Sequence, residues 1–489
     1  MSAQPIAETK SGMLRGRTID GVTAFLGVPY AAPPTGANRW RAARPHPGWA
    51  GVRDATAYGP SAPQPRPPQP HPLIGFHGEP PFDEDCLTLN IWTPAADDAR
   101  RPVVVWLHGG GFLTGSGNLD RYATDTFARN GDVVAVSINY RLGPLGFLSG
   151  LGDPNAWLTD QIAAVQWIAE NIAAFGGDPE RVTLAGQSGG AFAIAALAQH
   201  PSTRGLFQRA ILQSMPFAWE LIGVDVAVER TRALARHLGH GENIDALREE
   251  PWERLILGTQ AVMAEYAAFG VWSLAYTPVL DPGTIPRHPM ETLASADVDM
   301  ILGWTRDEAA FAFGVDPRCV AATREQVIDW AATRYSDIDA AAVLSEGLSP
   351  GEAVVRIVGD VMFRAPGLRM AEQRTTAPRP TYVYQFDVSS PMGPAVGAAH
   401  CLELPFAFGN LDRWSAAPFA QGFEPGSAAR ITDTLHRAWI GFIRDGDPTH
   451  AGLPSWPAYR SAEPAVLTIG DETRIDPAPT VPIIGAAQS

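Results

Sequence analysis

The sequence has few cysteines, no excess of positive charge and no long hydrophobic run. Its three cysteines, Cys86, Cys319 and Cys401, are scattered and lack metal-ligand spacing, so we expect reduced thiols rather than a disulfide framework. A formal net charge of −15 argues against nucleic acid or an anionic membrane as a partner, because both require a basic surface. Since we find neither a signal segment nor a run of ~18 apolar residues, we expect a cytoplasmic protein.

The composition favours one large globular unit. Of the 489 residues, 45% are hydrophobic and 18% are charged, which is enough to bury a sizeable core. We find no internal repeat or long linker, so we expect a single domain over residues 1–489. Nine prolines fall between residues 60 and 81, and they predict an irregular loop. No feature of the sequence specifies an oligomeric state, and we expect a monomer.

Continuous apolar runs separated by helical stretches dominate the rest of the chain. Such runs are typical of strands that are buried on both faces, and they predict an α/β fold with a mostly parallel sheet between helices. The predicted strands are 103–107, 133–138, 182–185, 210–213, 300–302 and 381–386. A helix is predicted over 159–175, starting at a cap-like Thr159 or Asp160. Residues of about 218–297 and 311–378 are expected to form helical insertions over the site.

A serine stands between glycines where a strand-like run meets a helix-like run. The pentapeptide Gly186-Gln187-Ser188-Gly189-Gly190 follows an apolar strand and precedes a helix of small residues. A sharp strand-to-helix turn brings backbone segments close together, so it requires glycine beside the serine and leaves that serine exposed. The pattern predicts Ser188 as a nucleophile.

A second glycine cluster directly follows the predicted strand 103–107. Residues His108-Gly109-Gly110-Gly111-Phe112 allow backbone N–H groups to turn inward without obstruction by side chains. Such donors stabilise the oxyanion of a tetrahedral intermediate. The pairing of this loop with Ser188 therefore predicts acyl transfer.

A serine nucleophile in this architecture requires an acid and then a histidine later in the chain. His400 follows the predicted strand 381–386 through small residues, whereas His436 lies in a helical run and His450 beyond it, so His400 is the expected base. For the acid, Asp307 and Glu308 follow the strand at 300–302, and spacing does not separate them.

These motifs and others in the same order give the chain a resemblance to a known family. It resembles the type-B carboxylesterases of the α/β-hydrolase fold, similar to bacterial para-nitrobenzyl esterases and more distantly to cholinesterases. The further matching motifs are Phe25-Leu26-Gly27-Val28-Pro29-Tyr30-Ala31, Glu84-Asp85-Cys86-Leu87-Thr88-Leu89-Asn90, Asn139-Tyr140-Arg141-Leu142-Gly143, Phe175-Gly176-Gly177-Asp178-Pro179, Leu404-Pro405-Phe406 and Gly446-Asp447-Pro448.

The resemblance implies a serine carboxylesterase that needs no metal or cofactor and acts on a small-molecule ester. It assigns Ser188 as nucleophile, His400 as general base and Glu308 as the triad carboxylate. It also assigns the oxyanion donors to Gly110, Gly111 and Gly189. Carbamate or amide hydrolysis by the same triad is an alternative function, and a non-catalytic cholinesterase-like interaction protein is another.

Four departures from the family pattern affect these expectations. Gln187 and Gly189 stand where the family usually has Glu and Ala, which removes a negative charge and predicts a site less suited to cationic substrates. The family cysteine that would pair with Cys86 is missing near residues 61–64, so we expect an unclipped loop. No tryptophan occurs in 70–83, which argues against a quaternary ammonium cage. Ala309 replaces the usual glycine after Glu308.

Aromatic residues next to the catalytic loops are candidates for substrate binding. Phe76, Phe112 and Trp304 each lie beside such a loop and are candidates to line an acyl or alcohol pocket, although aromatic residues beside a buried site more often pack in the core. Cys401 lies beside the proposed base, and we expect it to be a small buried hydrophobe rather than a reactive thiol.

Overall fold

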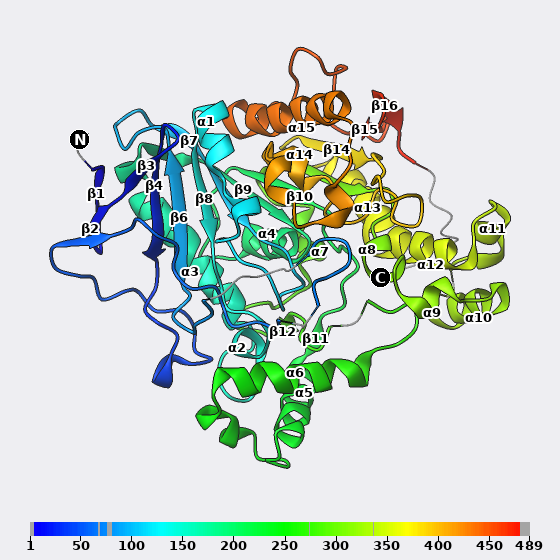
Figure 1. Cartoon of the computed structure of the whole chain (residues 1–489), viewed down its shortest axis with the longest axis horizontal. Coiled ribbons are helices and arrows are strands. Elements are labelled where there is room, and N and C mark those ends of the chain that lie inside the picture. The colour runs from blue at the N-terminus through cyan, green and yellow to red at the C-terminus, as the bar shows by residue number, and fades with distance from the viewer. Residues whose placement is uncertain (1–3, 67–68, 76–80, 273, 336, 480–489) are drawn as a thin grey trace.

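The computed structural model describes residues 4–66, 69–75, 81–272, 274–335 and 337–479. Its centre is an 11-stranded sheet in the order β16-β15-β14-β13-β10-β9-β7-β8-β6-β4-β3 (Figure 1). The strands of this sheet are β3 (Arg17–Ile19), β4 (Val22–Pro29), β6 (Thr88–Thr93), β7 (Arg101–Leu107), β8 (Val134–Ile138), β9 (Gly177–Gln187), β10 (Arg209–Gln213), β13 (Asp299–Thr305), β14 (Thr381–Phe386), β15 (Ala465–Ile469) and β16 (Thr473–Pro477).

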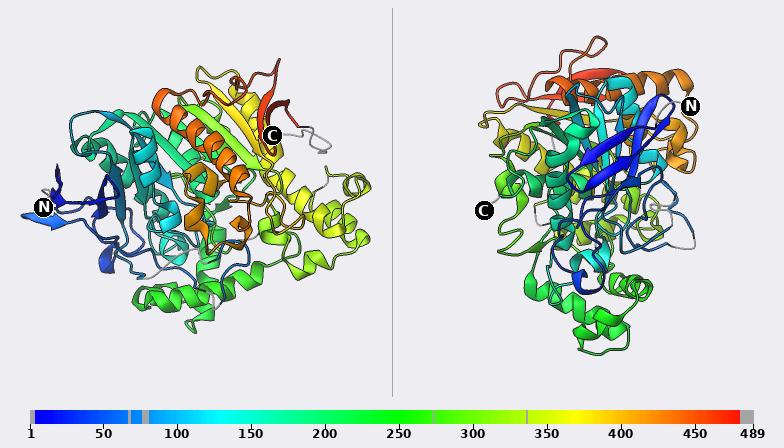
Figure 2. Two further views of the ribbon diagram at one scale, coloured as in Figure 1. Left: turned by 45° about the horizontal axis from the view of Figure 1, so that its top comes forward. Right: turned by 90° about the vertical axis from the view of Figure 1, so that its left-hand side faces the viewer.

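Helices lie on both sides of the sheet, as the two views of Figure 2 show. They are α1 (Asp125–Gly131), α2 (Gly143–Phe147), α3 (Ala156–Asn171), α4 (Gly189–Gln199), α5 (Val224–His237), α6 (Trp252–Tyr266), α7 (Pro289–Leu293), α8 (Ala310–Phe313), α9 (Pro317–Val320), α10 (Arg324–Arg334), α11 (Ala340–Ser345), α12 (Pro350–Gly359), α13 (Ala365–Arg374), α14 (Leu404–Phe408) and α15 (Pro425–Asp445).

The six predicted strands are neighbours at the centre of the sheet. They correspond to β8, β7, β9, β10, β13 and β14, and each pairs in parallel with the next. Along β7, Val103 and Val105 face the core that contains α3 and α4, whereas Val104 and Trp106 face the core that contains α14 and α15. Both faces are therefore buried, which explains the continuous apolar runs and confirms the prediction of a mostly parallel sheet.

The sequence prediction missed the outer strands. On one side β6, β4 and β3 continue the sheet in antiparallel pairing, and on the other β15 adds in parallel and β16 antiparallel. The remaining strands of the described residues form two small sheets. One consists of β1 (Ile6–Thr9), β2 (Gly12–Arg15) and β5 (Val52–Asp54), and the other of β11 (Ile222–Gly223) and β12 (Val279–Leu280). The β11–β12 pair lies inside the segment 218–297, which the sequence predicted to be helical throughout.

The helix predicted over 159–175 begins three residues earlier than expected. It is α3, which ends at Asn171 and continues as a 3₁₀ turn, Ile172–Phe175. Neither Thr159 nor Asp160 caps it. Asp160 is fully buried and pairs with Arg141 at 2.6 Å, so this carboxylate has a tertiary role rather than a local one.

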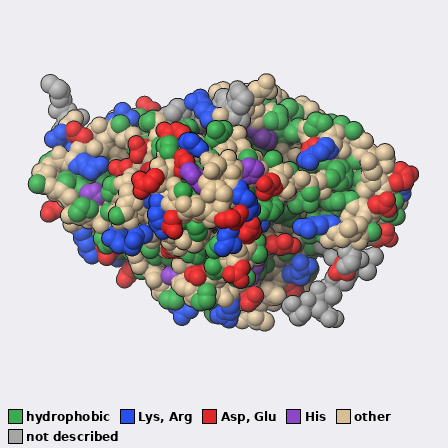
Figure 3. Space-filling model, turned by 90° about the horizontal axis from the view of Figure 1, so that it is seen from below, with side chains coloured by type: hydrophobic (Ala, Val, Ile, Leu, Met, Phe, Trp, Pro, Cys, Tyr) green, Lys and Arg blue, Asp and Glu red, His purple; other side chains and the backbone are tan. Residues whose placement is uncertain are grey.

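The two segments expected as insertions contribute most of the structure around one end of the sheet. Helices α5 and α6 lie below the sheet in Figure 1, and α9 to α12 lie to its right. In the described ranges, no helix is long and apolar enough to cross a membrane. Figure 3 shows acidic and basic side chains interspersed over the lower face, unlike the basic surface that nucleic acid requires.

Candidate active site

Ser188 lies on a strained turn between β9 and α4. Its backbone has φ +56° and ψ −125°, an uncommon conformation for a residue with a side chain, and its N–H donates to the carbonyl of Gln213 at 2.9 Å. The turn is tight because α4 presses against β7, and a Cβ at Gly190 would lie 2.0 Å from the carbonyl oxygen of Leu107. Ser188 is partly exposed, whereas its neighbours Gln187 and Gly189 are buried.

His400 and Glu308 meet on loops that follow neighbouring strands of the sheet. Glu308 follows β13 and His400 follows β14, and the carboxylate Oε2 accepts a short hydrogen bond from the imidazole Nδ1. The other oxygen of Glu308 accepts from the backbone N–H of Thr305 at 2.8 Å. Both side chains are buried, at 2% and 1% exposure, so their interaction is shielded from solvent.

Asp307 and Glu308, which spacing did not separate and of which the resemblance assigned Glu308, point to different partners. Asp307 pairs with Arg306 at 2.9 Å and accepts a hydrogen bond from the backbone N–H of Ala398 at 2.8 Å. A Cβ at Gly397 would lie 2.2 Å from the Asp307 carboxylate, and Gly397 has φ +52°, so this close approach requires glycine. Glu308, not Asp307, contacts the imidazole of His400.

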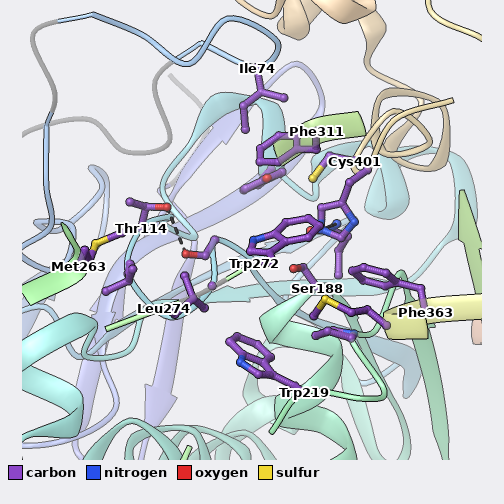
Figure 4. A pocket seen from close by; sticks show the side chains of 18 residues that line it. Ile74, Thr114, Ser188, Trp219, Met263, Trp272, Leu274, Phe311, Phe363 and Cys401 are labelled. Atoms are coloured by element: carbon purple, nitrogen blue, oxygen red, sulfur yellow. Dashed lines mark hydrogen bonds between the residues drawn. The ribbon is translucent and has the colours of Figure 1, made fainter. Parts of the chain in front are cut away.

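The glycine loop after β7 is oriented by hydrogen bonds to its carbonyl groups. The His108 Nδ1 donates to the Gly109 carbonyl at 2.8 Å, and burial lowers the pKa of His108 to about 4, which keeps this imidazole neutral. The Gly110 carbonyl accepts from the backbone N–H groups of Leu113 and Thr114 and from the Thr114 hydroxyl at 3.3 Å (Figure 4).

These bonds direct the following N–H groups. Because the C=O and N–H of a trans peptide point in opposite directions, a bound Gly109 carbonyl turns the N–H of Gly110 the other way, and a bound Gly110 carbonyl does so for Gly111. Gly110, Gly111 and Ser188 all line the same cavity. Within the part of the chain that the structure describes, no acceptor is found for the N–H groups of Gly110, Gly111 and Gly189.

The second ring nitrogen of His400 is also occupied. The side-chain nitrogen of Gln187 lies 2.9 Å from Nε2, and both residues are buried. Within the described residues no hydrogen bond joins the hydroxyl of Ser188 to His400, although both line the same cavity. In the sequence, Gln187 stood out only as a departure from the family pattern. Its contact with the histidine was not predicted.

Ser188 opens into an apolar cavity of about 290 Å³. Trp272 lies above Ser188 in Figure 4 and Trp219 below it, with Phe363 on one side and Leu274 on the other. The rings of Trp272, Phe311 and Phe363 surround the His400 imidazole, with centroids 5.4 to 5.8 Å away. The remaining lining side chains in the described ranges include no Asp, Glu, Lys or Arg.

The aromatic residues predicted from the sequence are not those that line the cavity. Phe112 is fully buried and packs against Trp157 and Trp219, with its ring centroid 4.4 Å and 5.5 Å from theirs. Trp304 is fully buried and donates to the side chain of Gln385 at 2.9 Å. These two predictions were wrong because both side chains point into the core, and Phe76 lies outside the described residues.

Apart from Tyr122, the aromatic side chains that line the cavity in the described ranges come from the two segments expected as insertions. Trp219 and Trp272 belong to the segment 218–297, and Phe311 and Phe363 to the segment 311–378. Phe311 lies three residues after Glu308, but Trp219, Trp272 and Phe363 have no catalytic motif beside them, so only the expectation that these segments cover the site pointed to those three.

The loop that lacks the family cysteine is held by hydrogen bonds. Gln64 is buried, and its amide both donates to the carbonyl of Gly115 at 2.9 Å and accepts from its N–H at 2.8 Å. The hydroxyl of Ser61 donates to that of Ser116 at 2.9 Å. Cys86 is free, so the loop has no disulfide clip, as expected, and hydrogen bonds tie it instead to residues just beyond the glycine cluster.

The three cysteines are free and buried. Cys401 lines the cavity beside His400, and burial raises the pKa of its thiol well above the usual value, so it is not a reactive thiolate. His436, the rejected alternative base, is buried on α15 and hydrogen-bonds the carbonyl of Ala407 at 2.9 Å. In the described ranges no three side chains form a cluster that would hold a metal ion.

Known proteins resemble this chain over almost its whole length. The sequence pattern of the carboxylesterase family matches residues 3–480. A phenmedipham hydrolase from Pseudarthrobacter oxydans is 59% identical over 476 residues, and the para-nitrobenzyl esterase of Bacillus subtilis is 35% identical, each with 96% of both chains covered. A solved carboxylesterase from Geobacillus stearothermophilus superposes with a TM-score of 0.85 at 33% identity, covering 97% of this chain and 98% of that one.

Proposed function

The chain belongs to the carboxylesterase family and is a carboxylic ester hydrolase, and we propose that Ser188, His400 and Glu308 form its catalytic triad. Its α/β-hydrolase fold, expected from the resemblance, is confirmed by the solved esterases. The observation that carries the triad is the contact of Glu308 with Nδ1 of a histidine that shares a cavity with a serine on a strained turn.

The proposed reaction passes through an acyl-enzyme on Ser188. His400 Nε2 removes the hydroxyl proton as the serine oxygen attacks the ester carbonyl, and the N–H groups of Gly110, Gly111 and Gly189 stabilise the oxyanion. The imidazolium then protonates the leaving alcohol. Water, deprotonated by the same Nε2, attacks the acyl group, and collapse of the second tetrahedral intermediate releases the carboxylic acid and regenerates Ser188.

The cavity favours neutral substrates with apolar groups on both sides of the scissile bond. Trp272 and Trp219 lie on opposite sides of Ser188, so each can contact a different part of the substrate. The only ionisable side chains among the described lining residues are His400, Cys401 and Tyr122. A cationic or carboxylate-bearing substrate would lose its hydration without gaining a charged partner.

Carbamate hydrolysis is a second candidate function. The relative that is 59% identical to this chain is named as a hydrolase of phenmedipham, and phenmedipham is an aryl carbamate. The same triad would form a carbamoyl-serine in place of an acyl-serine, with the same oxyanion donors. We propose that the enzyme hydrolyses aryl carbamates as well as esters. A comparison of kcat/KM for a carbamate and an ester with the same leaving group tests this proposal.

Other features remain proposals. We propose that residues 1–489 form a single catalytic domain with insertions at about 218–297 and 311–378, which limited proteolysis would test. A cytoplasmic location and a monomeric state are proposed as well, and fractionation of the source cells and light scattering would test them. The three free cysteines agree with a reducing compartment.

Hydrolysis of p-nitrophenyl acetate and butyrate by wild type and Ser188→Ala tests the triad. We expect turnover to fall by at least about 10³-fold in the variant, and a fluorophosphonate label to map to Ser188 in the wild type only. Unchanged turnover in Ser188→Ala would exclude this nucleophile. Melting temperatures of both proteins control for misfolding.

A further inference from the structure

Gln187 and Glu308 occupy the two ring nitrogens of His400. The carboxylate of Glu308 is an acceptor, so Nδ1 of the imidazole carries the proton between them. The side-chain nitrogen of Gln187 is a donor, so Nε2, 2.9 Å away, accepts through its lone pair. Together the two partners select a single neutral tautomer, with a proton on Nδ1 and none on Nε2. This is the tautomer that a general base requires.

We propose that the carboxamide of Gln187 is a positioning group that holds His400 in this neutral tautomer and keeps Nε2 unprotonated until substrate binds. The proposal rests on the proposed triad and assigns Gln187 no bond to the reacting atoms, although Gln187 is among the residues that line the cavity. As the ester enters, the Ser188 hydroxyl replaces the amide as the donor to Nε2. One hydrogen bond to Nε2 replaces another, and the proton on Nδ1 stays in place.

The backbone around Gln187 leaves the amide little freedom. The residue ends β9, and its side-chain oxygen lies so close to Gly109 that a Cβ there would approach it to 2.5 Å. With the oxygen directed at the glycine loop, the nitrogen faces the imidazole. The side chain of Gln187 therefore lies between the glycine loop and the base.

A carboxylate at the same position would act in the opposite way. An anion 2.9 Å from Nε2 stabilises the imidazolium, and an opposite charge at such a distance shifts a pKa by ~1–3 units. A protonated Nε2 cannot accept the serine proton. The neutral amide gives the same steric support without that charge.

The other titratable groups near His400 leave Glu308 as its main electrostatic partner. Burial raises the pKa of Glu403 to about 8, so this carboxyl group is neutral over the acid range. Burial lowers the pKa of His71, which stacks on Phe311, to about 4, so it is neutral above that pH. Burial raises the pKa values of three further side chains near His400, which are Cys401, Tyr122 and Tyr384. Charged side chains in this part of the described structure include Arg121 and the Arg306–Asp307 pair.

Two substitutions and a charge control test the proposal. Gln187→Glu adds the anion, Gln187→Met removes the hydrogen bond at similar volume, and Gln166→Glu adds the same charge at an exposed position of α3. The measurement is kcat/KM for a neutral ester between pH 5 and 9. We expect the acid limb to move up by at least one pH unit in Gln187→Glu alone, with a ~10-fold loss at pH 6.

For Gln187→Met we expect kcat to fall ~3- to 10-fold, with little change in KM and no shift in the acid limb of the pH profile. The reason is that His400 is less well ordered but no charge has been added beside it. An acid limb that stays within 0.3 unit of wild type in Gln187→Glu, or one that moves equally in Gln166→Glu, overturns the proposal. The melting temperature of each variant shows that it is folded.

Nitrogen NMR of histidine-labelled Ser188→Ala gives a readout that is independent of turnover. The His400 signals, identified by their loss in His400→Asn, are expected to show a proton on Nδ1 and a free lone pair on Nε2 at pH 7. A proton on Nε2 overturns the tautomer assignment even if the esterase triad is correct. Conversely, turnover that survives in Ser188→Ala refutes the triad, while this spectrum still decides the tautomer.

Discussion

The Asp307 carboxylate accepts a hydrogen bond from the backbone N–H of Ala398 at 2.8 Å and so joins the loop of Glu308 to the loop of His400. The N–H of Asp307 in turn donates to the carbonyl of Ala398 at 3.0 Å. Two adjacent carboxylates therefore act on one loop in different ways. Asp307 fixes its backbone, and Glu308 contacts the imidazole that the loop carries.

This division predicts unequal effects of removing each charge. Glu308→Gln should lower kcat by ~10³- to 10⁴-fold, because an amide can stabilise the wrong tautomer of His400 and cannot stabilise the imidazolium. Asp307→Asn should cost no more than about 10-fold and lower the melting temperature, since it weakens a loop contact and an ion pair. The two variants are compared by kcat at pH 8 and by calorimetry, and equal losses of kcat would contradict the assignment.

The two glycines after Ser188 should differ sharply in their tolerance of alanine. A Cβ at Gly189 would lie 3.6 Å from the ring of Phe112, an ordinary contact, whereas one at Gly190 would lie 2.0 Å from the Leu107 carbonyl. Gly189→Ala keeps the N–H donor, so kcat should stay within ~3-fold while α4 gains up to ~1 kcal/mol. Gly190→Ala should lose most activity and melt lower.

Kinetics and thermal unfolding of these two variants provide matched controls for each other. A large loss of kcat in Gly189→Ala, with normal stability, would mean that the N–H at this position or its surroundings are misassigned.

Glu403 predicts a stability that falls as the pH rises. Burial raises the pKa of this fully buried carboxyl from its usual 4.5 to about 8, so between these values the unfolded chain has lost a proton that the folded protein retains. The free energy of unfolding therefore decreases from pH 4.5 to 8, by at most ~1.4 kcal/mol per pH unit for one group, and levels off above. Glu403→Gln removes this dependence.

The corresponding measurement is the difference in melting temperature between Glu403→Gln and wild type at pH 5, 6.5 and 8. The melting temperature of Glu403→Gln should increase relative to that of the wild type as the pH rises. A constant difference across this range would show that Glu403 has an ordinary pKa in the folded protein.

The buried pair of Arg141 and Asp160 should be essential as a pair. Arg141 donates to Asp160 from two guanidinium nitrogens, at 2.6 and 2.8 Å, and its backbone N–H donates to the same carboxylate at 3.0 Å. Asp160→Ala leaves an uncompensated buried cation and should cost ~3–5 kcal/mol of stability. The double variant Arg141→Met with Asp160→Ala should recover part of that loss in chemical denaturation, and no recovery would contradict this account.

The features that could be predicted from the sequence are those set by local chemistry. Six mainly apolar runs, such as 103–107, are typical of strands covered on both sides, so the central sheet followed from the sequence. The glycines around Ser188 and before Phe112 likewise follow from turns that exclude side chains. The outer strands escaped prediction because their pairing depends on partners far away in the chain, as in β4 and β6.

By itself the sequence determined the central sheet, the serine turn, the glycine loop and the two candidate acids. Spacing left Asp307 and Glu308 open and the resemblance assigned Glu308, but only the tertiary structure shows Glu308 in contact with His400, because adjacent residues at the end of a strand take opposite directions. The tertiary structure also decided that Trp219 and Trp272, rather than Phe112 and Trp304, line the cavity, and that Gln187 contacts His400. These outcomes depend on contacts between distant parts of the chain, such as Glu308 with His400 across 92 residues and Gln187 with His400 across 213, which no local pattern records.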